Sequence, residues 1–153
     1  VLVVGGGAVA LRRAETLARC GARIRAVSPA FREGFPPDSE LLRRPFAAED
    51  LDGAVLAVAA SDDREVNRRV GREAQARGIP VSVADAAGES TFFFPSLISE
   101  GPTAVSVSSA GLSCALTRRL SDRLRSVWGA WVAEERAALE QADDSRGPRE
   151  EGR

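Results

Sequence analysis

The feature that most constrains this chain is a glycine-rich turn near its start, in VLVVGGGAVALRRAETL at residues 1–17. Residues 1–4 are all apolar, which predicts a short strand of the kind that is buried in a parallel sheet. Residues 8–20 predict a helix with small alanines for close packing, and Gly21 is suited to end it. A buried strand, a tight turn and a helix in this order predict the first unit of an α/β fold.

The glycines follow the pattern Gly5-x-Gly7-x-x-Ala10, with alanine in the third place. In dinucleotide-binding folds the first glycine permits the turn, and the second lets a pyrophosphate approach the backbone. The helix that follows offers free N–H groups and the positive end of its dipole to phosphates. A purely structural turn would show the same spacing, but the place of this one between strand and helix favours a nucleotide site.

Further along the chain, apolar runs predict four more strands, at residues 22–28, 41–46, 54–61 and 79–84. Ser61 is suited to cap a second helix that runs through Ala76. After Asp85 the pattern changes, and two extended segments lead to a long helix from Cys114 to about Gln141. The predicted fold class is α/β: a Rossmann-like, doubly wound parallel sheet, followed by the extended segments and the long C-terminal helix.

The long helix carries an apolar stripe at helical spacing. Its members are Leu116, Leu120, Leu124, Val127 or Trp128, and Trp131. Two tryptophans on one face of a helix that lies outside the sheet favour a subunit interface. The alternative is that this stripe packs back on the chain's own sheet, and the sequence leaves both open.

Composition narrows the chemistry that any active site can use. The chain has no histidine, lysine, tyrosine or methionine, so all 21 basic residues are arginine. Histidine base catalysis, lysine Schiff bases and histidine metal sites are therefore excluded, no metal ligands are predicted, and a general base must be Asp, Glu or Cys. Cys20 and Cys114 stand in no metal or redox spacing, which predicts two buried thiols and a reducing, cytoplasmic setting.

The charge pattern bears on the kind of ligand. A net charge of −1 gives no general support to nucleic-acid binding. Arginines gather in residues 8–25 and again in 113–128, and two local basic zones on a neutral protein suit a small polyanion better than a polymer. No apolar run is long enough to span a membrane. We therefore expect a small-molecule ligand, with no nucleic-acid or membrane partner.

Polar residues follow three of the predicted strands, at the sheet edge where ligands bind in this fold. Ser28 follows the second strand and can bond a ribose hydroxyl without repelling a 2′-phosphate, which leaves NAD and NADP both open. Ser61 and Asp62 follow the fourth strand, where they can line a dinucleotide site or cap a helix. Asp85 ends the fifth strand; it is either a turn residue or, in a chain with so few alternatives, a catalytic carboxylate.

A second small-residue turn, from Ser108 and Ser109 to Ser113, precedes the long helix. It can bind a carboxylate at the helix N-terminus, or it can be a plain capped loop. Arg118 and Arg119 lie just behind it and can bind substrate carboxylates or be ordinary solvated arginines.

Taken together, four stretches resemble the N-terminal module of siroheme synthase and its stand-alone relatives, the precorrin-2 dehydrogenases, some of which are also sirohydrochlorin ferrochelatases. The stretches are VLVVGGGAVALRRAETLARCGARIRAVSP, LAVAASDDREVNRRV, VSVADAAGESTFFFPS and AVSVSSAGLSCALTRRLSDRL. They follow the family's order and cover most of residues 1–125. Their combination is far more specific than the glycine pattern alone.

The resemblance implies that the cofactor is NAD and that the substrate is precorrin-2, a tetrapyrrole with eight carboxylates that is oxidised to sirohydrochlorin. NAD is implied to lie at residues 5–9 and around residues 28–30, and the residues selected to bind it are Gly5, Gly7, Ala8, Val9, Ser28, Pro29 and Ala30. In bifunctional members the same cleft then inserts ferrous iron as a substrate metal, and the motifs quoted do not separate the two kinds of member. Asp85 matches the family's catalytic aspartate and would act as general base.

The resemblance also bears on the second half of the chain. Ser109 matches a serine near the tetrapyrrole that is phosphorylated in some members, and the long helix would belong to a dimerisation region of a homodimer. The expected organisation is an NAD-binding domain at residues 1–90, a dimerisation and substrate-binding segment at 91–141, and a disordered tail at 142–153.

The chain departs from the family pattern at a few positions. Cys114 stands where proline is frequent, Ala110 where glycine is common, and Arg12-Arg13 where the family usually has Arg-Lys. The start inside a strand, without an initial methionine, suggests a fragment. One competing hypothesis is a non-catalytic NAD-sensing module, which explains the first five strands but not the basic second half. Another is a dehydrogenase for a different small substrate, which would not bind tetrapyrroles.

Overall fold

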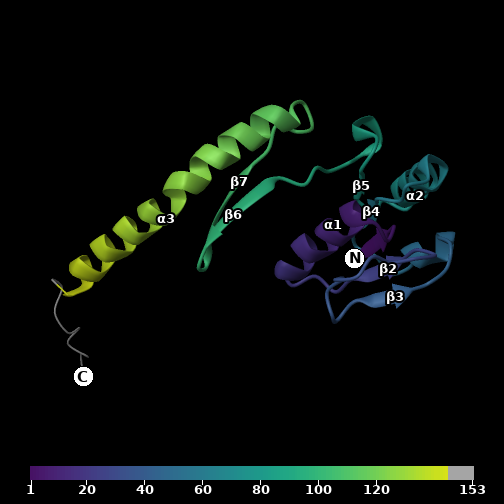
Figure 1. Ribbon diagram of the computed structural model, residues 1–153, viewed down its shortest axis with the longest axis horizontal. Helices are drawn as coiled ribbons and strands as arrows, with labels where there is room; N and C mark the ends of the chain where they lie inside the picture. The colour runs from purple at the N-terminus through teal and green to yellow at the C-terminus, as the bar shows by residue number, and fades with distance from the viewer. Residues whose placement is uncertain (145–153) are drawn as a thin grey trace, which may run out of the picture. The chain divides into compact units, whose positions relative to one another are not determined.

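A computed structural model describes residues 1–144 of the chain (Figure 1). The chain forms two compact units, Val1–Phe93 and a second that begins at Phe94. The predicted tail at 142–153 lies mostly outside the described residues, but its first three residues still belong to the long helix. Within residues 1–144, no helix has both the length and the apolar character that a bilayer span requires.

The first unit is built on a five-stranded sheet in which every pairing is parallel, in the order β3-β2-β1-β4-β5 (Figure 1). The strands are β1 (Leu2–Val4), β2 (Arg25–Val27), β3 (Glu40–Leu42), β4 (Ala57–Ala59) and β5 (Val81–Val83). The order reverses between β1 and β4, which is the switch point where doubly wound sheets bind their ligands. The predicted fold class is confirmed.

Two helices cover this sheet. Helix α1 (Ala8–Arg19) packs on β1 and β4, and α2 (Arg64–Ala76) packs on β4 and β5. Ala10, Ala14 and Ala74 are fully buried, and such small side chains let the helices approach the sheet closely. The strands are shorter than predicted, because flanking apolar residues such as Ala54 and Ile79 pack on the core without joining a ladder. Short 3₁₀ turns, η1 (Ala48–Leu51) and η2 (Ala87–Glu89), complete the unit.

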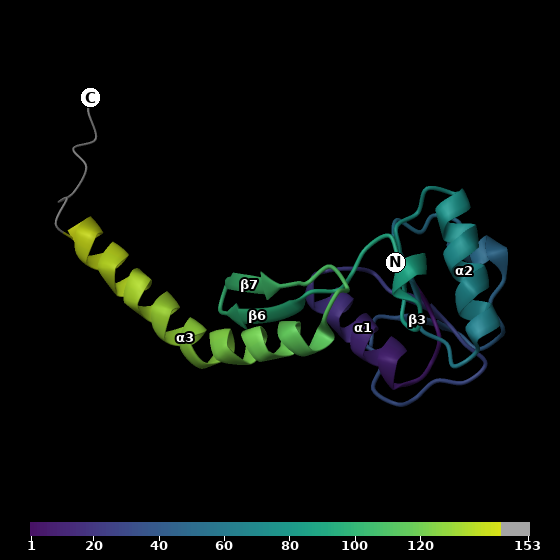
Figure 2. The ribbon, with the colours of Figure 1, turned by 90° about the horizontal axis from the view of Figure 1, so that it is seen from above.

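The second unit is an antiparallel hairpin with one long helix beside it (Figure 2). Strand β6 (Ser96–Glu100) pairs with β7 (Thr103–Val107), and α3 (Cys114–Asp144) packs on both. The face of α3 that is most buried carries Ser121 and Val132. The predicted apolar stripe is therefore divided: Leu116, Leu120 and Trp131 remain about half exposed, and Leu124, Val127 and Trp128 are half-buried.

Two local expectations are wrong. Cys20 and Cys114 are exposed rather than buried, because one is the C-terminal cap of α1 and the other is the first residue of α3. The cap of α2 is Asp63 and not Ser61: its carboxylate accepts hydrogen bonds from the N–H groups of Glu65 and Val66. The Ser61 hydroxyl instead accepts from the N–H of Asp63, over 3.1 Å.

Candidate active site

A cleft of about 920 Å³ lies at the carboxyl edge of the parallel sheet. Its walls come from the turn after β1 and the loops after β2, β4 and β5, because the carboxyl ends of parallel strands meet at one edge. The lining residues are Gly6, Gly7, Ala8, Val9, Arg12, Arg13, Ser28, Pro29, Ala30, Phe31, Arg32, Ala60, Ser61, Asp62, Ala84 and Asp85. Of the predicted site residues in the first unit, all except Gly5 line this one cleft.

Gly6 and Gly7 of the glycine turn line the floor of the cleft, whereas Gly5 does not line it. Gly5 has φ +127°, and a Cβ there would lie 2.3 Å from the carbonyl oxygen of Ala60. A Cβ at Gly6 would lie 1.8 Å from the carbonyl oxygen of Ala30. Neither position accepts a side chain. The Gly5-x-Gly7 pattern leaves the middle position open and so does not select Gly6. The run of three consecutive glycines was the feature of the sequence that could have indicated it.

Gly7 differs from its neighbours, because a Cβ there would meet no atom within 4 Å. It is the N-cap of α1 and makes no side-chain hydrogen bond, so no capping side chain occupies the N–H groups of the first helical turn. A glycine floor and an uncapped helix N-terminus fit a dinucleotide whose pyrophosphate lies against the backbone.

The wall after β2 is tied to the glycine turn through the main chain. Gly5 N–H donates to the carbonyl oxygen of Val27 over 2.9 Å, and Arg32 N–H donates to that of Gly6 over 2.8 Å. Ser28, Pro29 and Ala30 lie between these two bonds and line the cleft. The loop after β2 contains no acidic residue at the position where NAD-binding folds contact the ribose. Phe31 and Arg32 also line the cleft here, although the sequence pattern did not indicate them.

The wall after β4 is held by a buried asparagine. Asn67 is fully buried, and its side chain both accepts from the N–H and donates to the carbonyl oxygen of Ser61, each over 2.9 Å. This pair of bonds fixes Ser61 and Asp62 at the edge of the cleft. Sequence reasoning missed Asn67, since nothing in its local pattern distinguishes it from a solvent-facing helix residue.

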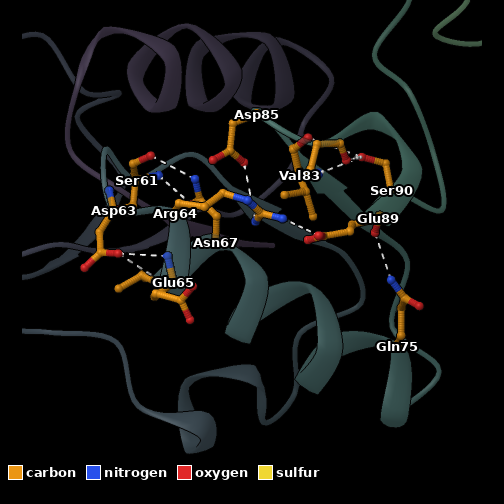
Figure 3. A network of polar contacts seen from close by, with 12 residues as sticks. Ser61, Asp63, Arg64, Glu65, Asn67, Gln75, Val83, Asp85, Glu89 and Ser90 are labelled. Carbon is orange, nitrogen blue, oxygen red and sulfur yellow. Dashed lines mark hydrogen bonds and ion pairs between the residues drawn. The ribbon is translucent and has the colours of Figure 1, made fainter.

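Asp85 lies two residues after the end of β5, in a network of charged side chains (Figure 3). Arg64, the first residue of α2, places Nη1 3.9 Å from Asp85 Oδ1 and bonds Oε1 of Glu89 through Nη2. The hydrogen bond to Glu89 is the main reason why the pKa of Arg64 is raised above its ordinary value. The sequence does not reveal this network, because its members come from three separate elements.

The remaining predicted residues belong to the second unit. The Ser109 hydroxyl accepts from Ser113 N–H and from the Thr117 hydroxyl, over 3.0 and 2.9 Å. Ser108 accepts from the N–H of Ala110, and Arg118 and Arg119 are exposed on α3. These bonds make a capped turn at the start of α3, with two arginines available to solvent beside it.

Comparison with known proteins identifies the first unit. Residues 1–96 match the model of an NAD(P)-binding family, NAD_binding_7. The chain is 41% identical over 152 residues to a siroheme synthase of Methylobacillus flagellatus, covering 92% of this chain and 32% of that protein. It is 43% identical over 128 residues to a siroheme synthase of Pseudomonas aeruginosa, covering 80% of this chain and 28% of that one. The chain thus spans about a third of the length of these relatives.

A solved structure agrees with the sequence matches. The fold is similar to that of "SirC, precorrin-2 dehydrogenase", with a TM-score of 0.74 and 26% identity. The similarity covers 86% of this chain and 69% of that one. The glycine floor, the uncapped N-terminus of α1 and the match over residues 1–96 have one explanation: this chain belongs to the NAD(P)-binding family.

Proposed function

We propose that this chain oxidises precorrin-2 to sirohydrochlorin with NAD as the electron acceptor. The observation that carries the proposal is the position of Asp85, a carboxylate on the wall of a dinucleotide cleft in a chain that has no histidine, lysine or tyrosine. Similarity to siroheme synthases and to a precorrin-2 dehydrogenase supports the same assignment. A non-catalytic NAD-sensing module is not favoured by these similarities.

In the proposed reaction the chain binds and orients the cofactor and the substrate, and it removes one proton from the substrate. Gly5, Gly6 and Gly7 with the N-terminus of α1 would hold the pyrophosphate, and the loops after β2 and β4 would hold the two nucleoside halves. When bound, NAD⁺ supplies the oxidising power by accepting two electrons and one proton from the substrate. The second proton leaves the substrate for the Asp85 carboxylate, and a partly exposed side chain can pass it on to water.

The arginines are the proposed partners of the substrate carboxylates. Arg12, Arg13 and Arg32 line the cleft, and guanidinium groups bind carboxylates through two parallel hydrogen bonds. Within the second unit, the proposed substrate-binding residues are Ser108, Ser109, Arg118 and Arg119. Their hydroxyl and guanidinium groups are suited to carboxylates, and both arginines are exposed.

Two further assignments belong to this proposal. A homodimer through α3 is supported by the half-exposed Leu116, Leu120 and Trp131, and light scattering of the wild type and of Leu120→Glu would test it. The cytoplasm is the proposed location, since two exposed free thiols are typical of a reducing compartment. Ferrous iron is a candidate second substrate, to be added once the oxidation is measured.

The decisive experiment mixes the purified protein with precorrin-2 and NAD in the absence of metal. We expect NADH and sirohydrochlorin to appear together by absorbance, and Asp85→Asn to lower kcat by a factor of about 100 or more while NAD still binds. Asp52→Asn is the matched control, because Asp52 is an exposed carboxylate in a surface ion pair with Arg77. NAD binding without turnover in the wild type would favour the sensing module instead.

A further inference from the structure

We propose that Arg64, held by Glu89, is a positioning residue for Asp85: it fixes the carboxylate at the cleft wall and balances the neighbouring negative charge. The inference rests on the proposed function, in which Asp85 takes a proton from the substrate. Among the described residues, Asp85 lines the cleft and Arg64 does not. Arg64 therefore acts on Asp85 from behind the wall.

The backbone around Arg64 is fixed on both sides. Asp63 caps α2 directly before it, and Asn67 bonds the main chain of Ser61 one turn away. A long arginine side chain that starts from so rigid a base reaches a defined place. Its direction is then set by the partner of its guanidinium group.

That partner is Glu89, and its own position is also fixed. Gln75 of α2 donates to the carbonyl oxygen of Glu89 over 2.8 Å. The Ser90 hydroxyl accepts from the N–H of Val83 over 2.9 Å, which ties the loop back to β5 (Figure 3). The main chain of Glu89 is thus held in place beside Arg64, and the loop that carries Asp85 is tied to both α2 and β5.

The guanidinium group divides its two terminal nitrogens between two carboxylates. Nη2 bonds Glu89, whereas Nη1 is buried and makes no hydrogen bond within the described part of the chain. Nη1 lies 3.9 Å from Asp85 Oδ1, too far for a hydrogen bond but close enough for a direct ionic attraction. The side chains are 42% and 39% exposed, so solvent weakens this attraction without removing it.

The charges around Asp85 give Arg64 a large influence on how easily the Asp85 carboxylate is protonated. Glu89 of η2 and Asp62 of the loop after β4 are negative, whereas Arg12, Arg13 and Arg32 line the cleft from other walls. Arg64 forms an ion pair with Asp85. Without it, both carboxylates would lose the cation that they share, and protonation of Asp85 would become easier. Without the Glu89 charge, Arg64 would act on Asp85 alone and protonation would become harder.

These two substitutions therefore predict opposite shifts, which is the basis of the test. The experiment measures kcat/KM for precorrin-2 oxidation against pH in the wild type, Arg64→Gln and Glu89→Gln. We expect the acidic limb to move up by roughly half to one pH unit in Arg64→Gln and down by a similar amount in Glu89→Gln. Arg64→Lys keeps the charge, so its acidic limb should stay close to that of the wild type. Arg68→Gln is the matched control, because Arg68 is an exposed arginine on the same helix, paired with Glu65.

A second readout separates this proposal from the function on which it rests. The carboxyl ¹³C signal of Asp85, followed by NMR without substrate, should show the same two opposite shifts of its titration midpoint. If the wild type does not turn over precorrin-2, the proposed function fails while the NMR titration still tests Arg64. Unchanged midpoints in both variants, or shifts of one sign accompanied by equal losses of thermal stability, would overturn the positioning role.

Discussion

A Cβ atom at Gly6 would lie 1.8 Å from the carbonyl oxygen of Ala30, which is inside any permitted contact distance. The carbonyl oxygen of Gly6 in turn accepts from the N–H of Arg32 over 2.8 Å. The turn after β1 and the loop after β2 therefore meet backbone to backbone at the floor of the cleft. This contact joins the phosphate end of the cleft to the wall on which the ribose would lie.

Gly6→Ala should destabilise the protein and weaken NAD binding together. The new methyl group must displace the main chain at Ala30, at a cost of about 2 kcal/mol or more. Urea unfolding and a calorimetric NAD titration would measure the two effects. Gly7→Ala is the matched control for the unfolding measurement only, because Gly7 also belongs to the proposed pyrophosphate site. Its methyl group enters open space and should change the free energy of unfolding by only about 0.5 kcal/mol. Equal stability of the two variants would contradict the role assigned to Gly6.

Asn67→Ala should loosen the wall of the cleft after β4. The substitution leaves the N–H and the carbonyl oxygen of Ser61 without their side-chain partners, and we expect the free energy of unfolding to fall by about 2–3 kcal/mol. NAD affinity should fall as well, because Ser61 and Asp62 lose their support. Ser61→Ala removes only the hydroxyl and keeps the main-chain bonds, so its stability loss should be smaller. A larger loss in Ser61→Ala would show that this ranking is wrong.

The pair formed by Asp50 and Arg44 should make stability depend on pH. Hydrogen bonding to Arg44 is the main reason why the pKa of the buried Asp50 carboxyl lies below its ordinary value, with the N–H of Ala47 as a further donor. A carboxyl with a lowered pKa stabilises the fold above its unfolded pKa of about 4, and this contribution is lost as the pH falls further.

Asp50→Ala tests this dependence. The free energy of unfolding should fall by about 2 kcal/mol at pH 7, since several bonds to a buried carboxylate are lost. The difference from the wild type should narrow at pH 3, because this pH lies below the unfolded pKa of about 4, where the contribution of the ionised carboxylate to stability declines. Urea unfolding at both pH values measures it. A difference that stays constant between pH 7 and pH 3 would rule out the ionised carboxylate as its source.

Ala110→Gly should stabilise the turn before α3. Ala110 has φ +50°, in the left-handed region that costs a residue with a Cβ atom about 1 kcal/mol. Glycine removes this strain, and we expect a net gain of about 0.5 kcal/mol after its greater freedom in the unfolded chain is counted. Thermal unfolding would measure the gain. Ala133→Gly, in the interior of α3, is a control that should instead lower stability by a similar amount.

Much of the fold could be predicted from the sequence, because the signals are local. Apolar runs of a few residues, glycines at turns and helical spacing of small residues are read within one segment, and each marks an element that the structure contains. The carboxyl edge of the sheet follows from the parallel order, so Ser28, Ser61 and Asp85 could be expected at one cleft before any coordinates. The ends of the strands could not be predicted, because Ala54 and Ile79 pack on the core without forming strand hydrogen bonds, and an apolar pattern does not distinguish the two.

The residues that organise the cleft were decided only by the tertiary structure. Arg64 and Glu89 are 25 positions apart, and their pairing depends on how α2 lies against the loop after β5. Asn67 looks like any polar helix residue until the main chain of Ser61 is found beside it. The sequence by itself determined which elements form and which side chains reach the sheet edge, because those depend on local periodicity. Packing determined which charges and hydrogen-bonding groups meet there, because that depends on distances between segments that are remote in the chain.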